Sequence, residues 1–207
     1  MSNLFIKICG LTRADEAESI AALEVDALGV ILHADSPRVI TVEDAQAIRK
    51  VVPPSTKLVG VVVNASHQRI QSLVDQIGLD IVQLHGDEDS DFARQLSVPY
   101  IKAIRPRSQG QALADVRAYP SAQAMLLDPF TEGQYGGTGH ILDSSVWPVK
   151  SSKPLILAGG LSADNVIERV SLLKPWGVDL NSGVENSPGR KNLEKVVRAV
   201  AQLRCVK

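Results

Sequence analysis

The sequence predicts an α/β protein with the architecture of a (β/α)8 TIM barrel. Eight short runs rich in Val, Ile and Leu recur along 207 residues, and segments with helical spacing separate them. The runs are apolar on both faces, which is typical of strands in a buried parallel sheet. Eight strand–helix units favour a closed barrel, whereas five or six would favour an open doubly wound sheet.

The expected strands follow one another at short intervals. They lie at 4–9, 27–32, 57–63, 80–84, 100–104, 124–127, 154–157 and 177–180. Because 207 residues are near the lower limit for such a barrel, the loops must be short. With 44% hydrophobic residues, the chain has enough apolar material for one core, so we expect one compact domain over residues 1–207.

Helix starts are marked by capping residues. Thr12 with Asp15, and Thr41 with Asp44, have the Thr-x-x-acid spacing that satisfies free amide groups at a helix N-terminus. The helices after the fifth and sixth strands are the weakest predictions: one thin helix over 109–119, and barely a turn over 140–147.

Two late helices have clear apolar faces. One is expected to open at Ser162 as its N-cap and to bury Val166, Val170 and Leu173. The other is expected to begin at Asn192. It would place Leu193, Val196, Val197, Val200 and Leu203 on one face.

Composition narrows the classes of partner. Twenty-two basic and 23 acidic side chains leave a formal charge of −1, so no overall field attracts a nucleic acid or an anionic membrane. Small molecules are the expected partners. Cys9 and Cys205 form no Cys-x-x-Cys pair, and the histidines are not clustered, so neither a disulfide framework nor a zinc site is expected. A reducing, cytoplasmic setting follows.

The N-terminal segment has no features of a targeting or membrane segment. Lys7 interrupts its apolar run, and Asp15 and Glu16 follow closely. We therefore expect neither a signal peptide nor a transmembrane span at this end.

Candidate catalytic groups fall at strand ends. Cys9 ends the first strand and Asp128 follows the sixth, and the C-terminal ends of barrel strands carry the active site. A thiol and a carboxyl facing each other suit proton transfer. Amide groups at the following helix start would lower the pKa of Cys9. The competing interpretations are a small buried cysteine and an aspartate in a turn before Pro129.

Further candidates would bind the substrate. Arg38, in a turn stiffened by Pro37, has the fork that binds a carboxylate, although a solvated surface arginine is the alternative. Gln83 and His85 follow the fourth strand and Asp179 belongs to the eighth. His85 would orient a substrate oxygen, or simply cap the strand end.

Two glycine-containing turns predict phosphate binding. Gly159 and Gly160 precede a helix start after the seventh strand, and Ser182 and Gly183 form a small-residue turn after the eighth. Glycines let backbone amides approach an anion, and a helix N-terminus adds free N–H groups. The alternative is that these glycines only cap turns. A further glycine-rich segment, 136–139, is expected to be either a closing flap or a surface loop.

Several motifs together resemble one known family, the phosphoribosylanthranilate isomerases of tryptophan biosynthesis. They are Lys-Ile-Cys-Gly-Leu-Thr at 7–12, Ser-Pro-Arg at 36–38, Gln-Leu-His-Gly-Asp-Glu at 83–88, Leu-Asp at 127–128, Gly-Gly-Thr-Gly at 136–139 and Ser-Gly-Val-Glu at 182–185. The combination of Lys-x-Cys-Gly with Gln-Leu-His-Gly is specific. The resemblance runs from the first strand to the last helix.

This resemblance implies an Amadori rearrangement without a cofactor or a metal. It assigns the general base to Cys9 and the general acid to Asp128, the substrate carboxylate to Arg38, and the phosphate to the last two loops. A monomer or a weak homodimer is expected. Two alternatives remain open: a histidine-pathway phosphoribosyl isomerase, which typically uses two aspartates, and a catalytically silent barrel that binds a phosphosugar.

Overall fold

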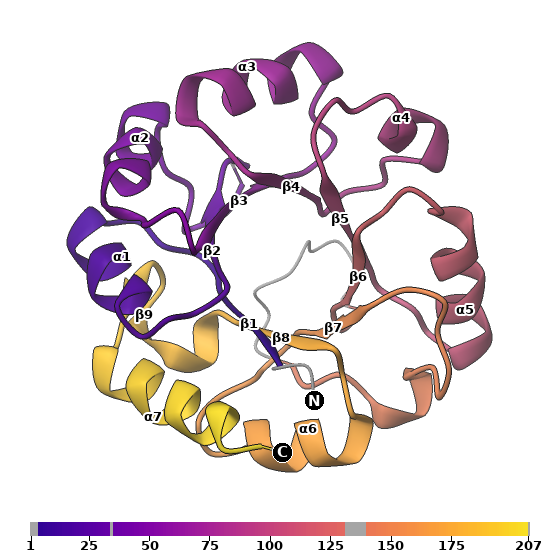
Figure 1. Ribbon diagram of the computed structural model, residues 1–207. Coiled ribbons are helices and arrows are strands. Elements are labelled where there is room, and N and C mark those ends of the chain that lie inside the picture. Colours follow the sequence, from indigo (N-terminus) through magenta and orange to yellow (C-terminus); the bar gives the residue numbers. More distant parts are fainter. Residues whose placement is uncertain (1–3, 34, 131–139, 207) are drawn as a thin grey trace.

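Eight parallel strands close into a barrel in the computed structural model, which describes residues 4–33, 35–130 and 140–206. The strands are β1 (Phe5–Ile8), β2 (Ala27–Ile31), β3 (Lys57–Val62), β4 (Ile81–Leu84), β5 (Tyr100–Ile104), β6 (Ala124–Leu127), β7 (Leu155–Leu157) and β8 (Gly177–Leu180). They are hydrogen-bonded in sequence order, and β8 pairs with β1 (Figure 1). The predicted fold class is confirmed.

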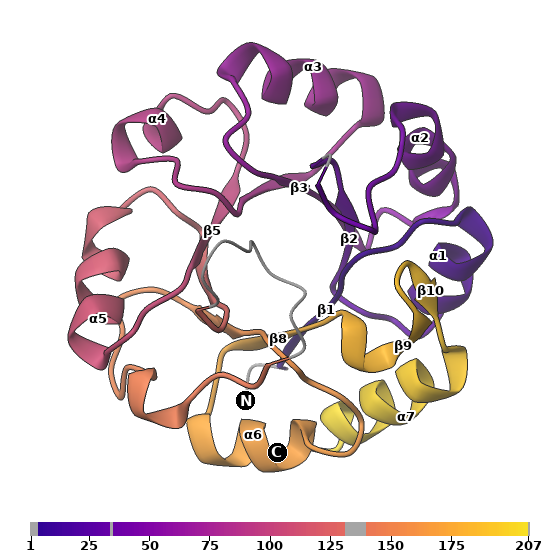
Figure 2. The ribbon, with the colours of Figure 1, turned by 180° about the vertical axis from the view of Figure 1, so that it is seen from behind.

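Helices surround this barrel in both end-on views (Figures 1 and 2). They are α1 (Ala14–Ala21), α2 (Val42–Val51), α3 (His67–Ile77), α4 (Ser90–Arg94), α5 (Gln109–Ala118), α6 (Val166–Leu173) and α7 (Leu193–Arg204). Short 3-10 helices η1 (Ser144–Val146) and η2 (Ser182–Val184) follow β6 and β8, and a small hairpin of β9 (Glu185–Ser187) and β10 (Arg190–Lys191) precedes α7. No helix of the described ranges is both long and apolar enough to cross a bilayer.

The prediction of weak helices after β5 and β6 was correct only in part. After β6, the described residues contain just the three-residue η1, as expected. After β5, however, α5 is a regular ten-residue helix whose N-cap Ser108 accepts a hydrogen bond from the Gln111 amide. The shortest α-helix is instead α4, with five residues, because the chain reaches β5 soon after its Asp89 cap.

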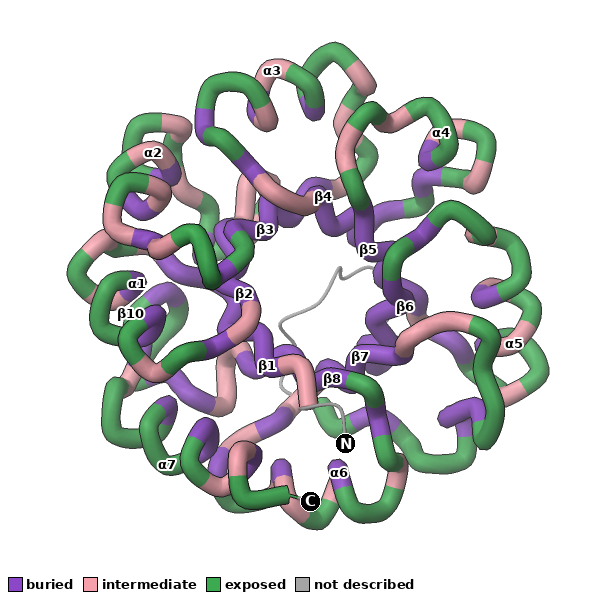
Figure 3. The backbone as a smooth tube through the Cα atoms, in the orientation of Figure 1, coloured by how far each residue is buried: buried purple, intermediate pink, exposed green. Residues whose placement is uncertain are grey.

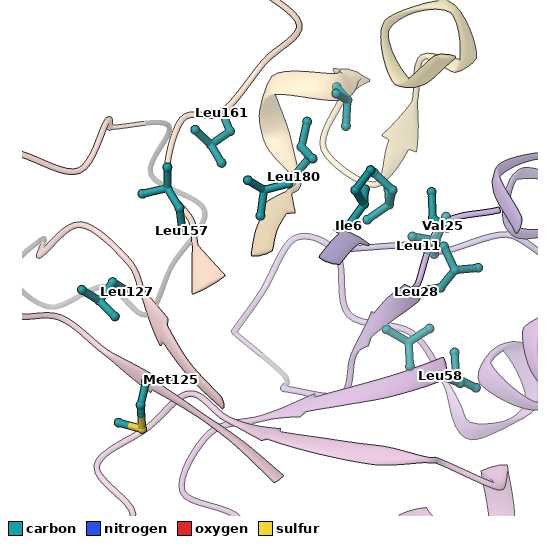
Figure 4. Packing of buried hydrophobic residues seen from close by; sticks show 14 of the residues in the cluster. Ile6, Leu11, Val25, Leu28, Leu58, Met125, Leu127, Leu157, Leu161 and Leu180 are labelled. Atoms are coloured by element: carbon teal, nitrogen blue, oxygen red, sulfur yellow. The ribbon is translucent and has the colours of Figure 1, made fainter. Parts of the chain in front are cut away.

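Apolar side chains form two separate cores. The larger core lies between the barrel and its helices; Ile6, Leu28, Leu58, Met125 and Leu180 are among its members in Figure 4. The smaller core fills the barrel interior and consists of Ile101, Ala103, Ala124, Leu126, Ile156 and Ala158. Because the strands are covered on both sides, they are buried almost throughout (Figure 3).

Two of the predicted helix starts were wrong. Thr12 does not cap α1, which begins at Ala14 without a side-chain cap; the Thr12 hydroxyl donates to the Gly189 carbonyl instead, at 2.6 Å. The helix α6 begins at Val166, so Ser162 opens a preceding turn rather than the helix itself. The Thr41 capping box is confirmed, since both of its reciprocal hydrogen bonds are present.

The apolar face predicted for α7 included residues that the structure leaves exposed. Val196, Val200 and Leu203 are buried, whereas Leu193 and Val197 are 46% and 43% exposed. These two residues lie four apart on one flank, which the barrel does not cover, and Ala199 completes the buried stripe. On α6, Val166 and Val170 are buried, but Leu173 is only partly covered.

Truncation of a leucine in the larger core should weaken the barrel. Leu58 of β3 is fully buried, so Leu58→Ala should lower the free energy of unfolding by about 2–5 kcal/mol, measured by urea denaturation. Leu172→Ala is the matched control, because Leu172 is 58% exposed and its loss should change little. Equal losses in the two variants would contradict the burial described.

Candidate active site

Polar side chains occupy the barrel interior at the C-terminal ends of the strands. Side chains alternate along each strand, so Ile6 and Ile8 face the helices while Lys7 and Cys9 face the interior. The same alternation turns Gln83, His85, Asp128 and Asp179 inward, above the apolar interior core. The inner surface is therefore apolar at its centre and polar at the mouth where loops follow the strands.

His85 lies between a glutamine and a carboxyl. Its Nδ1 is 2.8 Å from Nε2 of Gln83, and its Nε2 is 3.5 Å from an Oδ2 oxygen of Asp128. All three side chains are buried. Neither Oε1 of Gln83 nor Nε2 of His85 has a hydrogen-bond partner, so two buried polar atoms are available to a ligand beside Asp128.

The loop that carries His85 is held from outside the barrel. Glu88 accepts hydrogen bonds from the amides of Asn64 and Gly86, and Lys102 donates to Glu88 at 2.8 Å and to the Gly86 carbonyl at 2.7 Å. Lys102 points away from the interior, since its neighbours Ile101 and Ala103 belong to the inner core. This buried ion pair holds the β4–α4 loop in place directly after His85.

Cys9 is buried at the end of β1. Its amide donates to the Leu180 carbonyl at 2.9 Å, and its side chain lies close to the Lys7 ammonium. A Cβ built on Gly29 of β2 would lie 2.7 Å from the Cys9 sulfur and 3.2 Å from Lys7 Nζ. Glycine at this position thus leaves room for both groups.

The pKa of the Cys9 thiol is not lowered by helix amides, contrary to what the sequence suggested. Burial raises the pKa of Cys9, and the positive charge of Lys7 offsets only part of that rise. The expected lowering by helix amides was wrong, because α1 begins five residues beyond Cys9, at Ala14. Lys7, with a smaller contribution from Lys191, favours the thiolate in place of the helix end that the sequence predicted.

Asp179 lies beside Lys7 on the neighbouring strand. Its Oδ2 is 2.8 Å from Lys7 Nζ, and its Oδ1 is buried without a partner. Burial raises the pKa of Asp179, while Lys7 acts in the opposite direction. For Lys7, burial lowers the pKa, but Asp179 and Cys9 outweigh this effect and raise it, so the ammonium stays charged.

Arg38 forms a buried cluster with Glu185 and Lys191. Its Nε and Nη2 donate to the Glu185 carboxylate at 2.8–3.1 Å, and Lys191 donates to the same carboxylate at 2.8 Å and to Asn181 Oδ1 at 3.0 Å. A Cβ on Gly10 would lie 2.9 Å from Arg38 Cδ, so this arginine reaches the loop that follows Cys9. The predicted fork exists, but here it binds a carboxylate of the protein.

The two glycine-containing turns lie against each other. Gly159 and Gly160 have positive φ angles of 86° and 55°, which favour glycine. A Cβ on Gly183 would come within 2.1 Å of the Leu161 carbonyl oxygen, so only glycine allows this contact. Ser182 is the first residue of η2. The loops after β7 and β8 therefore present backbone groups side by side at the mouth.

The structure thus gathers the residues that the sequence named. Cys9, Gln83, His85, Asp128 and Asp179 share the barrel interior, and Arg38 and the glycine turns adjoin it. Sequence reasoning assigned no role to Lys7, Glu185 or Lys191. The sequence does contain a signal for a role of Lys7, because this lysine stands between two isoleucines of a barrel strand. The predicted flap at 136–139 lies outside the described residues.

A closed (β/α)8 barrel with a thiol, carboxyls and an imidazole at its mouth belongs to the class of barrel enzymes that move protons on small molecules. No group of three or more His, Cys, Asp or Glu side chains in the described part of the chain could hold a metal ion. The family model for N-(5'-phosphoribosyl)anthranilate (PRA) isomerase matches residues 6–202.

Individual relatives agree with the family model. N-(5'-phosphoribosyl)anthranilate isomerase of Pseudomonas putida KT2440 is 42% identical over 205 residues, which cover 98% of this chain and 100% of the relative. Phosphoribosyl anthranilate isomerase from Thermus thermophilus aligns with a TM-score of 0.87 and 34% identity, over 97% of this chain and 98% of that one. The chain belongs to the N-(5'-phosphoribosyl)anthranilate isomerase family.

One relative was solved with a ligand. It is a phosphoribosyl anthranilate isomerase in complex with reduced 1-(o-carboxyphenylamino)-1-deoxyribulose 5-phosphate. It aligns with a TM-score of 0.86 and 29% identity, over 98% of this chain and 100% of that one.

Acid should weaken the contribution of the Arg38 cluster. Burial acts to raise the pKa of Glu185, but Arg38 and Lys191 outweigh it and hold the pKa below its ordinary value of 4.5. The stabilisation is therefore complete above that value and is lost as the pH falls through the lower pKa of the folded state. At pH 7, Glu185→Gln should cost about 3 kcal/mol of unfolding free energy.

The test compares urea unfolding of wild type and Glu185→Gln from pH 7 down into the acid range. The difference between them should shrink below the ordinary glutamate pKa. Glu194→Gln, an exposed change on α7, is the control and should show almost no difference at any pH. A gap that stays constant with pH would contradict the electrostatic assignment.

Proposed function

We propose that this chain converts N-(5-phosphoribosyl)anthranilate into 1-(2-carboxyphenylamino)-1-deoxyribulose 5-phosphate in tryptophan biosynthesis, by an Amadori rearrangement that needs no cofactor. Family membership identifies the isomerase activity. The observation that carries the mechanism is a thiol and a carboxyl, Cys9 and Asp128, buried at the ends of β1 and β6 of one barrel.

Proton transfers account for the reaction, and Asp128 and Cys9 carry out the first two. The Asp128 carboxyl donates a proton to the furanose ring oxygen, the bond from that oxygen to C1 breaks, and the anthranilate nitrogen forms a Schiff base with C1. The Cys9 thiolate then removes the proton from C2, and the electron pair moves into the C1–C2 bond to form an enolamine. Tautomerisation gives the ketone. The imine itself accepts the electrons, so acid–base groups suffice.

The neighbouring side chains support this assignment. The unpartnered atoms of Gln83, His85 and Asp179 are hydrogen-bonding groups that suit the sugar hydroxyls. His85 is also 3.5 Å from Asp128, close enough to influence the orientation of that carboxyl.

Two anionic ends of the substrate require separate sites. Arg38, Glu185 and Lys191 together carry one net positive charge, which suits the anthranilate carboxylate. We assign the phosphate to the backbone of Gly159, Gly160, Ser182 and Gly183, because two adjoining glycine-containing turns suit an anion.

We further propose one domain, acting in the cytoplasm as a monomer or weak homodimer on a phosphorylated sugar, without nucleic acid or membrane partners. The unpaired thiols of Cys9 and Cys205 fit a reducing compartment. A relative from Thermotoga maritima is described as dimeric, with monomers generated from it.

Growth without tryptophan tests the function. A bacterial strain that lacks this isomerase should grow when it carries this chain, and should fail with the Cys9→Ala/Asp128→Asn double variant. A strain lacking the corresponding histidine-pathway isomerase should still require histidine. Failure of the first rescue despite folded protein would contradict the proposal, and rescue of only the second strain would favour the alternative isomerase.

Removal of either proton carrier should abolish most of the turnover. Cys9→Ala and Asp128→Asn should each lower kcat by about two to four orders of magnitude, the usual effect of losing a positioned acid or base. Steady-state kinetics with N-(5-phosphoribosyl)anthranilate measure this loss. Cys205→Ala is the control, because Cys205 is exposed at the end of α7. Near-normal turnover of Cys9→Ala would remove the thiol from the mechanism.

A further inference from the structure

The barrel interior contains a lysine for which the mechanism above has no use. Lys7 lies in the middle of β1, and none of its surface is exposed. Interiors of such barrels are mostly filled by branched apolar side chains, so a buried cation requires a reason.

The contacts of Lys7 are directed at the proposed base. Lys7 is the register partner of Asp179 across the β1–β8 seam, and their side chains are joined at 2.8 Å. Cys9 is two residues further along the chain and therefore on the same face, and its sulfur and the Lys7 ammonium lie 2.7 Å and 3.2 Å from the position that a Cβ on Gly29 would take. Gly29, on β2, leaves the space that the sulfur and the ammonium occupy.

We propose that Lys7 is a positioning residue for proton abstraction: its ammonium lies beside the Cys9 sulfur and stabilises the thiolate, while Asp179 holds that ammonium in place. The inference rests on the proposed function of Cys9 as the base, and it names the group that favours the thiolate form of this buried cysteine.

The charges around the sulfur support this assignment. Lys7 faces Cys9 from β1, Asp179 from β8 and Lys191 from β10, and Gly29 of β2 lies next to the sulfur. Lys191 is in turn paired with Glu185, which also binds Arg38. Asp179 and Glu185 partly neutralise the cations, and Lys7, which lies beside the sulfur, contributes more to stabilising the thiolate than Lys191 does.

A purely structural role explains the pair less well. Replacing a buried ion pair by apolar side chains of similar size often leaves a protein equally stable or more so. The interior below Lys7 is already apolar, with Leu126 and Ile156 fully buried in it. A leucine or methionine at position 7 would continue that packing, so stability alone does not call for a lysine.

Titration of the thiol tests the proposal without any substrate. All variants carry Cys205→Ser, which leaves Cys9 as the single thiol, and its thiolate is followed by ultraviolet absorbance against pH. Lys7→Met should move the Cys9 titration upward by at least one pKa unit, roughly a tenfold loss of thiolate at neutral pH. The value of kcat/KM should fall by a similar factor and recover as the pH is raised.

A second pair of variants guards against loss of folding. Lys7→Met alone leaves Asp179 buried without its cation, so Lys7→Met/Asp179→Asn is compared with Asp179→Asn, where no uncompensated carboxylate remains. The double variant should still titrate higher than Asp179→Asn. Lys102→Met is the matched control, because this equally buried lysine faces away from the interior and its loss should leave the Cys9 titration unchanged.

The outcomes separate the two proposals. If Cys9 titrates at the same pH in the double variant as in Asp179→Asn, Lys7 does not act through the thiol, and the inference is overturned even if kcat falls. If Lys7 shifts the titration but Cys9→Ala retains near-normal turnover, the base assignment fails instead, and with it the positioning role.

Discussion

The pairing of β1 with β8 is the contact on which the site depends. Four residues of β1 align with four of β8, and the Cys9 amide extends the ladder to Leu180. This seam closes the barrel and sets Lys7 beside Asp179. Because side chains alternate every two residues, a slip of one position would turn Lys7 and Cys9 toward the helices and Ile6 and Ile8 inward. The apolar packing against α1 and α7 therefore fixes the register and, with it, the position of the thiol.

Two groups of three polar side chains lie at or next to the mouth of the barrel. One group is Cys9, Lys7 and Asp179, and the other is Arg38, Glu185 and Lys191. In each group a buried charge is shared between two partners, which limits the cost of removing it from water. The second group retains a net positive charge, and the first retains a thiol whose protonation depends on its neighbours. The anion binding and the proton transfer that we propose thus draw on adjacent networks.

The hairpin of β9 and β10 connects these networks to the loops. Glu185 starts it, Lys191 ends it, and the Gly189 carbonyl between them accepts the Thr12 hydroxyl from the β1–α1 loop. Residues at the chain's beginning and end therefore support one another around Cys9. On the opposite side, Glu88 and Lys102 hold the loop after β4 in the same way. The proposed catalytic residues Cys9 and Asp128 directly follow strands, and buried ion pairs hold neighbouring loops in place.

Periodicity and spacing determined the eight strands, their parallel closure, and the arrival of Cys9, His85 and Asp128 at one end of the barrel, because these features follow from local pattern and from a regular topology. Local pattern failed where a side chain finds a distant partner: Thr12 binds Gly189 and Arg38 binds Glu185. It also failed for Cys9, because burial raises a pKa that a helix end was expected to lower. Lys7 looked like a break in an apolar run. Only the tertiary structure showed it paired with Asp179, 172 residues away, because burial and electrostatic environment depend on contacts between segments that the chain brings together on folding.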